Sequence, residues 1–195
     1  IIGSVAALNQ NSKLDYSVMF FGMIGISIPN FVMAPLLVLF FSIGLKALPA
    51  GGYNGGDFYH MILPVISLAL PQMAYIARLT RGSMIEVLSS NFVRTAKAQG
   101  LPTRSILLKH VLKPTLLPVV SYLGPATAAI ITGSVVVEQI FGLPGLGRYF
   151  VQGALNRDYT LVMGVVVFYG CLIILFNLVV DTLYGFIDPR IKQNR

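Results

Sequence analysis

The sequence predicts an all-α fold, a polytopic transmembrane helical bundle that forms a single domain over residues 1–195. Composition is the first reason: 55% of the residues are hydrophobic and 11% are charged, whereas a soluble domain carries about 25% charged residues. The second reason is that the apolar residues gather in four long stretches. The third is that most of the basic residues fall on one side of those stretches. Because a soluble protein could not cover its surface with so few charges, membrane insertion is predicted.

The four apolar stretches are long enough to cross a membrane, which takes about 20 mostly apolar residues. They lie at about 17–45, 61–77, 115–137 and 161–180, and the first three contain prolines. An interior proline costs a soluble helix about 3 kcal/mol. In a packed membrane bundle, neighbouring helices, side chains or waters satisfy the freed carbonyl groups. The prolines therefore favour a packed bundle over a soluble helical protein or a single anchor.

The distribution of basic residues predicts the orientation. Four spans leave five segments on alternating sides, and one side receives eleven of the fourteen Lys and Arg residues: Lys13, Arg78, Arg81, Arg94, Lys97, Arg104, Lys109, Lys113, Arg190, Lys192 and Arg195. Positive residues near span ends stay in the cytoplasm. The first residue, the central segment at about 79–114 and the C-terminus are therefore predicted to be cytoplasmic. This orientation accounts for the net charge of +7, so no nucleic-acid partner is expected.

The central segment is predicted to form two short helices joined by a turn. Its first part has apolar residues at helical spacing, which predicts an amphipathic helix; these residues are Ile85, Leu88, Phe92 and Ala96. Gly100 stands where a helix ends in a left-handed residue, and Pro102 blocks continuation. Thr103 is expected to cap a second helix at about 104–113. A basic helix lying on anionic lipid stays open as an alternative, although lipid binding does not require a sharp turn.

The stretch "RTAKAQGLPTRSILLKHVLKPTLLPV" resembles the cytoplasmic loop of binding-protein-dependent ABC importer permeases, known by a Glu-Ala-Ala…Gly pattern. With Gly100 aligned, Arg94 and Thr95 stand where that pattern has Glu-Ala, and Ala96 is the second Ala. This departure resembles the peptide branch of the family. Further stretches match the same branch, closest to the first of the two membrane subunits of bacterial oligopeptide importers: "ALNQNSKLDYSVM", "LPAGGYNGG", "ARLTRGSMIEVL", "GLPGLGRYFVQGALNRDY" and "DTLYGFIDPRI".

This resemblance implies a type I ABC importer permease in the bacterial plasma (inner) membrane. In such importers a second homologous permease subunit completes the pore, two cytoplasmic ATP-binding subunits drive it, and a periplasmic or extracellular binding protein delivers peptide. A full subunit usually has six spans, so four spans after the apolar start "IIGSVAAL" imply the C-terminal part of a longer chain. The residues implied in coupling to the ATP-binding subunits are Arg94, Thr95, Ala96, Gly100, Leu101, Pro102 and Arg104.

Three polar residues within the spans are candidates for lining a pore or supporting a kink. Asn30 and Gln72 each follow a proline and could bond a freed carbonyl group, while Asn177 shares a helical face with Asp181. Asp181 lies near the predicted cytoplasmic end, which favours an interfacial position over a proton relay. The glycine-rich stretch "GLPGLG" lacks the Lys-Ser/Thr of a P-loop, so an external loop followed by a short interfacial helix at about 149–155 is expected.

No catalytic residues, metal site or cofactor are predicted. The function expected from these observations and the resemblance is that of a permease subunit of an ATP-driven oligopeptide importer, in which membrane lipid surrounds the chain and separate subunits hydrolyse ATP. Two alternatives stay open: an ion-gradient-coupled carrier and a non-transporting membrane scaffold. Ion-coupled carriers place ionisable groups at mid-membrane, and the predicted spans offer only Asp181 near one end.

Overall fold

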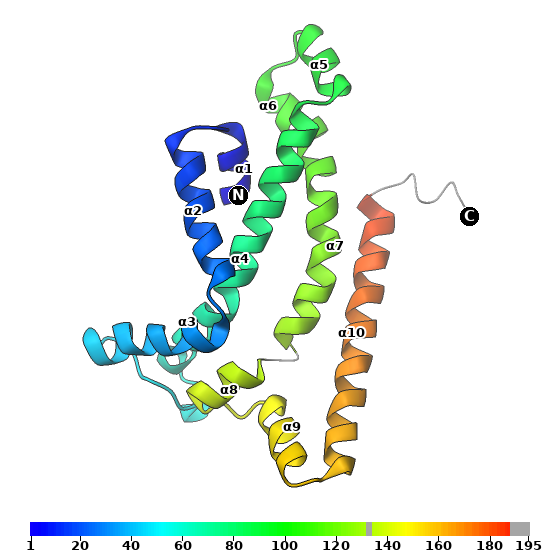
Figure 1. Ribbon diagram of the computed structural model, residues 1–195. Coiled ribbons are helices and arrows are strands. Elements are labelled where there is room, and N and C mark those ends of the chain that lie inside the picture. Colours follow the sequence, from blue (N-terminus) through cyan, green and yellow to red (C-terminus); the bar gives the residue numbers. More distant parts are fainter. Residues whose placement is uncertain (132–133, 188–195) are drawn as a thin grey trace. The chain divides into compact units, whose positions relative to one another are not determined.

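The computed structural model describes residues 1–131 and 134–187, in which the regular elements are all helical (Figure 1). In chain order they are α1 (Ile2–Leu8), α2 (Lys13–Ser27), α3 (Asn30–Leu37), the π-helical η1 (Val38–Gly44), the 3-10 turn η2 (Asn54–Gly56), α4 (Phe58–Leu88), α5 (Asn91–Ala98), α6 (Thr103–Ser105), the π-helical η3 (Ile106–Val111), α7 (Leu112–Ile131), α8 (Val135–Phe141), α9 (Leu146–Leu155) and α10 (Tyr159–Ile187). The predicted all-α class is confirmed.

Three stretches of helix are long and apolar enough to cross a membrane: Phe58–Leu88, Thr103–Ile131 and Tyr159–Thr182. A bent pair, Lys13–Ser27 with Asn30–Gly44, provides a fourth candidate if the pair counts as one span. The described residues therefore fit the predicted polytopic fold. Where the membrane boundaries fall along these helices stays a prediction.

The first apolar stretch is broken near its middle. α2 ends at Ser27, Pro29 has extended backbone (φ −62°, ψ 148°), and α3 begins at Asn30. Pro29 therefore precedes a new helix, whereas the sequence analysis expected proline kinks within one span. Pro35 lies inside α3, and the helix continues into η1 with π-helical bonding. A π-helical stretch just after a proline is one way to accommodate its missing N–H.

α4 and α7 also differ from the predicted ranges. α4 continues to Leu88, so residues placed by sequence in the cytoplasmic segment prolong the same helix. Pro64 and Pro71 lie inside α4 without ending it, and the buried Ser67 hydroxyl donates to the Pro64 carbonyl at 2.9 Å. At the other helix, residues 135–137 of the predicted third span belong to α8. The predicted cytoplasmic tail with Arg190, Lys192 and Arg195 lies outside the described residues.

The first of two compact units combines Ile1–Ile24 and Met73–Gly124 with the part of α10 that starts at Asn177. α1 packs closely on α4, because a Cβ atom on the buried Gly3 would overlap the carbonyl oxygen of Ala77. α4 and α7 contact each other through Tyr75 and Tyr122, whose stacked rings have centroids 4.2 Å apart. Close contacts therefore fix α1 and α7 to the same part of α4.

The second unit combines Gly25–Gln72 with Pro125–Phe176 and has its own apolar core. The buried members come from α3, α4 and α8, and they are Ala34, Leu63, Val137 and Phe141. The loop before η2 is tied to this core, since the Gly52 N–H donates to the Phe141 carbonyl at 2.7 Å. The loop's glycines allow the approach: a Cβ on Gly51 would lie 2.9 Å from that same carbonyl oxygen.

The "GLPGLG" stretch is organised around one buried carboxylate in this unit. Glu138 of α8 is 9% exposed and accepts a hydrogen bond of 2.8 Å from the Gly147 N–H, in the first turn of α9. A negative charge is favourable at a helix N-terminus. The absence of a side chain at Gly145 makes space for the Glu138 carboxyl group, because a Cβ on Gly145 would overlap it. α9 confirms the helix predicted after this loop and begins at Leu146, before the predicted start.

Candidate functional site

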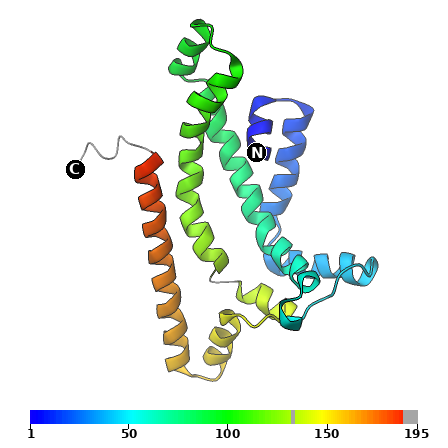
Figure 2. The ribbon, with the colours of Figure 1, turned by 180° about the vertical axis from the view of Figure 1, so that it is seen from behind.

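The segment between α4 and α7, called here the tip segment (residues 89–111), has the predicted helix–turn–helix form. α5 follows a break at Ser89 and Ser90, and the chain becomes helical again at Thr103. Figure 1 and Figure 2, from opposite sides, show α5 and α6 beyond the ends of the paired helices α4 and α7. The tip segment therefore extends from the first unit as a compact pair of short helices.

The tip segment is held in place by one apolar face of α5, which packs on a buried hydrophobic cluster. The buried cluster beneath it contains Ala7, Met84, Val93, Ala96, Ile106 and Val111. The sequence analysis expected Phe92 on this face, and that expectation is wrong: Phe92 is 47% exposed, whereas Val93 is 0% exposed. The helix break causes the difference. Ser90 has extended backbone (φ −68°, ψ 154°), so the helical register restarts at α5 and turns Val93 inward.

Gly100 ends α5 in the predicted left-handed conformation, with φ +75°. The Gly100 N–H donates to the Lys97 carbonyl at 3.0 Å, and the Leu101 N–H donates to the Ala96 carbonyl at 3.3 Å. These two bonds form the Schellman pattern, which satisfies carbonyl groups left free at a helix end. The turn between the two helices is therefore held by its own backbone hydrogen bonds.

The second helix of the tip begins differently from the prediction. Pro102 is the N-cap residue, in extended conformation, and no side chain caps this end; Thr103 is already the first helical residue. The predicted Thr103 cap is therefore wrong. From Thr103 the helix runs through the π-helical η3 directly into α7. The second helix of the tip is thus the end of a candidate membrane span, since Thr103–Ile131 qualifies as one long apolar helix.

The exposed surface of the tip segment is basic. Its cationic side chains are all exposed, no acidic residue occurs in residues 91–110, and no ion pair to them occurs within the described residues; they are Arg94, Lys97, Arg104 and Lys109. Thr95, Leu101 and Pro102 are exposed beside them, whereas Ala96 is 6% exposed and belongs to the buried cluster. Ala96 therefore differs from the other implied coupling residues, because it packs beneath the exposed surface of the tip segment and is not part of it.

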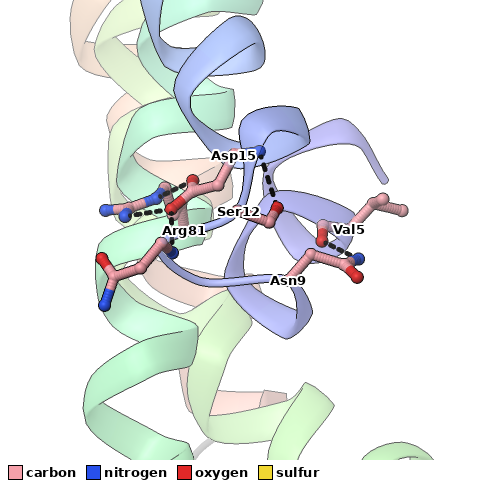
Figure 3. Close-up of polar contacts among 6 residues, drawn as sticks. Val5, Asn9, Ser12, Asp15 and Arg81 are labelled. Atoms are coloured by element: carbon pink, nitrogen blue, oxygen red, sulfur yellow. Dashed lines mark hydrogen bonds and ion pairs between the residues drawn. The ribbon is translucent and has the colours of Figure 1, made fainter.

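A second polar centre in the same unit, Asp15, was missed by the sequence analysis. Asp15 is 1% exposed and is held by a two-pronged ion pair: Arg81 Nε donates to Oδ1 at 2.5 Å and Nη2 donates to Oδ2 at 2.7 Å (Figure 3). The local signal was available, since Ser12 and Asp15 have the spacing of a helix capping box. The partner gives no such signal, because Arg81 lies 66 positions away along the chain.

The polar candidates within the predicted spans lie in different surroundings. Asn30 is the first residue of α3 and is half-buried, and its side chain makes no hydrogen bond to a freed carbonyl group within the described residues. Gln72 lies on α4 and is half-buried. Asn177 of α10 is exposed, and its Oδ1 would lie 3.2 Å from a Cβ on Gly124. A pore-lining role for each stays a prediction.

The described residues contain no group of three or more His, Cys, Asp or Glu side chains that could hold a metal ion. What the first unit does present is an exposed basic tip, a self-bonded turn at Gly100 and a buried ion pair beneath them. Such an arrangement is suited to contact with another protein.

Fold and site together define a multi-pass, all-helical membrane protein with a projecting paired-helix segment. The chain belongs to the family described as binding-protein-dependent transport system inner membrane component, whose model matches residues 1–193. It is 60% identical over 190 residues to the oligopeptide transport system permease proteins OppB of Haemophilus influenzae and Escherichia coli K12, covering 97% of this chain and 62% of each relative. It is 47% identical over 195 residues to the dipeptide transport system permease protein DppB of Bacillus subtilis, covering 63% of that relative. The chain therefore spans less than two thirds of the length of these curated relatives.

Proposed function

We propose that this chain acts as a membrane-spanning permease subunit of an ATP-driven peptide importer, with oligopeptides as the substrate class. Its helices form part of the translocation pore together with a second, homologous permease subunit. Two cytoplasmic ATP-binding subunits supply the energy, and a periplasmic or extracellular peptide-binding protein delivers the substrate. The observation that carries this proposal is the exposed paired-helix tip segment, in a chain that belongs to the binding-protein-dependent transport family.

The tip segment is the proposed contact with an ATP-binding subunit. Its coupling residues are Arg94, Thr95, Ala96, Gly100, Leu101, Pro102 and Arg104. Two properties support this role. The backbone bonds at Gly100 fix the angle between the two short helices, so the tip can transmit a push. The exposed cations have no acidic neighbour within residues 91–110, which suits a groove of opposite charge on a partner.

This role fixes the proposed orientation and energetics. The tip segment and the C-terminus lie in the cytoplasm, and the loops around η2 and α9 face outward, as the distribution of basic residues favours. ATP hydrolysis belongs to the partner subunits, and the chain itself needs no cofactor. The names of relatives at 60% and 47% identity, oligopeptide and dipeptide permease proteins, support peptides as the substrate class.

Co-purification with a transport assay tests the proposal. The full-length subunit, tagged and mildly solubilised from its own membranes, is expected to bring down a second permease subunit and two ATP-binding subunits. The complex is then reconstituted in vesicles whose lumen corresponds to the cytoplasm. With the binding protein outside, these vesicles should take up labelled oligopeptide only when the lumen contains ATP. Uptake that survives without ATP and collapses with an ionophore would support the carrier alternative. Stable recovery of the subunit without ATP-binding partners would support a scaffold.

A further inference from the structure

The buried Asp15–Arg81 pair is a built feature of the first unit. The Asp15 carboxylate accepts three hydrogen bonds: two from the Arg81 guanidinium and one of 2.9 Å from the Asn11 N–H. Ion pairs with two parallel N–H···O bonds combine strength with a fixed geometry. Asp15 is 1% exposed and the Arg81 side chain is 25% exposed, so the carboxylate is shielded from the solvent that weakens surface ion pairs and the guanidinium is partly shielded.

The turn between α1 and α2 is shaped to present this carboxylate (Figure 3). The Asp15 N–H donates to the Ser12 hydroxyl at 3.2 Å, which starts α2. Asn11 has φ +62°, a left-handed conformation that Asn tolerates better than most residues. The Asn9 side-chain amide closes the end of α1 by donating to the Val5 carbonyl at 2.9 Å. The Arg81 bonds therefore hold a rigid turn, and through it both α1 and the start of α2.

The pair lies next to the base of the tip segment. Arg81 is three positions before Met84 on α4, and Met84 belongs to the buried cluster that seats α5. The C-terminal end of α1, which leads into this turn, also reaches the cluster, because Ala7 is one of its buried members. One turn earlier than Arg81 along α4, Gly3 near the start of α1 packs on the backbone at Ala77. α1, the start of α2 and the upper part of α4 are thus joined at several successive points below the tip.

We infer that Asp15 and Arg81 are positioning residues for coupling: their ion pair locks α1 and the start of α2 to the end of α4 that carries the tip segment. A displacement of the tip then moves these helices together, and α2 is the first helix of the bent apolar pair. Without the lock, the tip and α4 can move while α2 stays behind. The inference rests on the proposed function, because it assigns the pair a role in transmitting the work of ATP-binding subunits.

A charged lock suits this task better than an apolar contact. Apolar packing permits small sliding movements, whereas a two-pronged ion pair is either formed or broken. Loss of the Arg81 guanidinium leaves the Asp15 carboxylate as an uncompensated buried charge, which is strongly unfavourable. The pair therefore enforces one register between α2 and α4, and single substitutions are expected to have a large effect.

The test compares single substitutions in the full-length subunit within the assembled transporter. Asp15→Asn keeps side-chain size and Arg81→Gln shortens the side chain, and each removes one charge. Arg81→Lys keeps the charge and loses the paired N–H geometry. Arg78→Gln is the matched control, because Arg78 is exposed on the same helix, three positions earlier. Each complex is quantified, and peptide uptake and ATP hydrolysis are measured per complex.

Arg81→Gln and Asp15→Asn are expected to lower peptide uptake per ATP hydrolysed by about tenfold, within the usual range of coupling between distant sites. Arg81→Lys should show a smaller loss, and Arg78→Gln should equal the wild type. If the neutral variants fail to assemble, Arg81→Lys decides. Uptake per ATP within twofold of wild type in the variants that assemble would overturn the inference, including the case in which only the amount of complex falls. A wild-type complex that shows no ATP-dependent peptide uptake would instead overturn the proposed function.

Discussion

Gly100 illustrates how a single residue determines the shape of the tip segment. Its φ of +75° lies in the left-handed region, and a Cβ placed there would meet no other atom within 4 Å. Substitution of Gly100 is therefore limited by the left-handed backbone conformation and not by lack of space for a side chain. An L-residue in this region costs about 1–2 kcal/mol, and β-branched residues are the least tolerant. Asn is the residue that replaces Gly most readily at such helix ends.

Gly100→Val is therefore expected to distort the turn, and to lower peptide uptake by about tenfold or more, since a strain of 1–2 kcal/mol corresponds to such a factor. Gly100→Asn should retain most of the uptake. Gly82→Ala on α4 is the control for a glycine substitution into open space, because a Cβ there also meets nothing within 4 Å. Uptake assays on complexes with equal amounts of subunit measure the effect. Wild-type uptake by Gly100→Val would contradict a rigid coupling turn, and a larger loss in a Lys97→Ala/Arg104→Ala variant would favour the lipid-binding alternative.

At the scale of elements, α5 is a short helix whose position depends on the buried cluster beneath it. An eight-residue helix is only marginally stable in isolation, so tertiary packing must hold it in place. Val93 is the most deeply buried side chain that α5 contributes, at 0% exposed. The same cluster contains Ile106 and Val111 of η3, so it also joins the two helices of the tip.

Val93→Ala should loosen α5 by about 2 kcal/mol, the cost of removing two buried methyl groups and leaving a cavity. Hydrogen exchange of the α5 backbone amides in the full-length protein is expected to speed up by more than about tenfold, because local opening free energy sets that rate. Val5→Ala on α1 is the matched control, with a side chain 40% exposed. Equal exchange of α5 in both variants would show that the cluster does not seat this helix.

Features caused by residues close together in the sequence could be predicted, whereas a contact between distant residues could not. The turn at Gly100 has a local cause, a glycine followed by proline two positions later, and it was predicted. The break before α5 also has local causes, since the Ser89 and Ser90 hydroxyls donate to the Glu86 and Val87 carbonyls at 2.7 and 2.6 Å. The prediction from the spacing of apolar residues did not take these serine hydrogen bonds into account. It therefore placed Phe92, and not Val93, on the buried face of α5. The Asp15–Arg81 pair joins distant parts of the chain, which no local pattern encodes.

At the scale of the whole molecule, the unequal distribution of basic residues and the helical fold together make orientation testable. The residues predicted to face outward include the loop around η2 and the end of α9, where Asn54 and Asn156 are exposed. The residues predicted to face the cytoplasm include the tip segment, where Ser89 is exposed. Residues 1–195 contain one cysteine, the exposed Cys171 on α10, and its replacement leaves these residues without a thiol.

In a Cys171→Ser background of the full-length protein, Asn54→Cys and Asn156→Cys are expected to react with a membrane-impermeant thiol reagent added to intact spheroplasts. Ser89→Cys should react only in inside-out vesicles or after permeabilisation. The reason is the bias of Lys and Arg: eleven of fourteen fall on the side of the tip segment, and moving such charges across a membrane during insertion is unfavourable. Mass spectrometry of the labelled subunit gives the extent of reaction at each position. Labelling of Ser89→Cys from outside, with Asn54→Cys protected, would reverse the orientation and place the tip segment beyond the reach of cytoplasmic ATP-binding subunits.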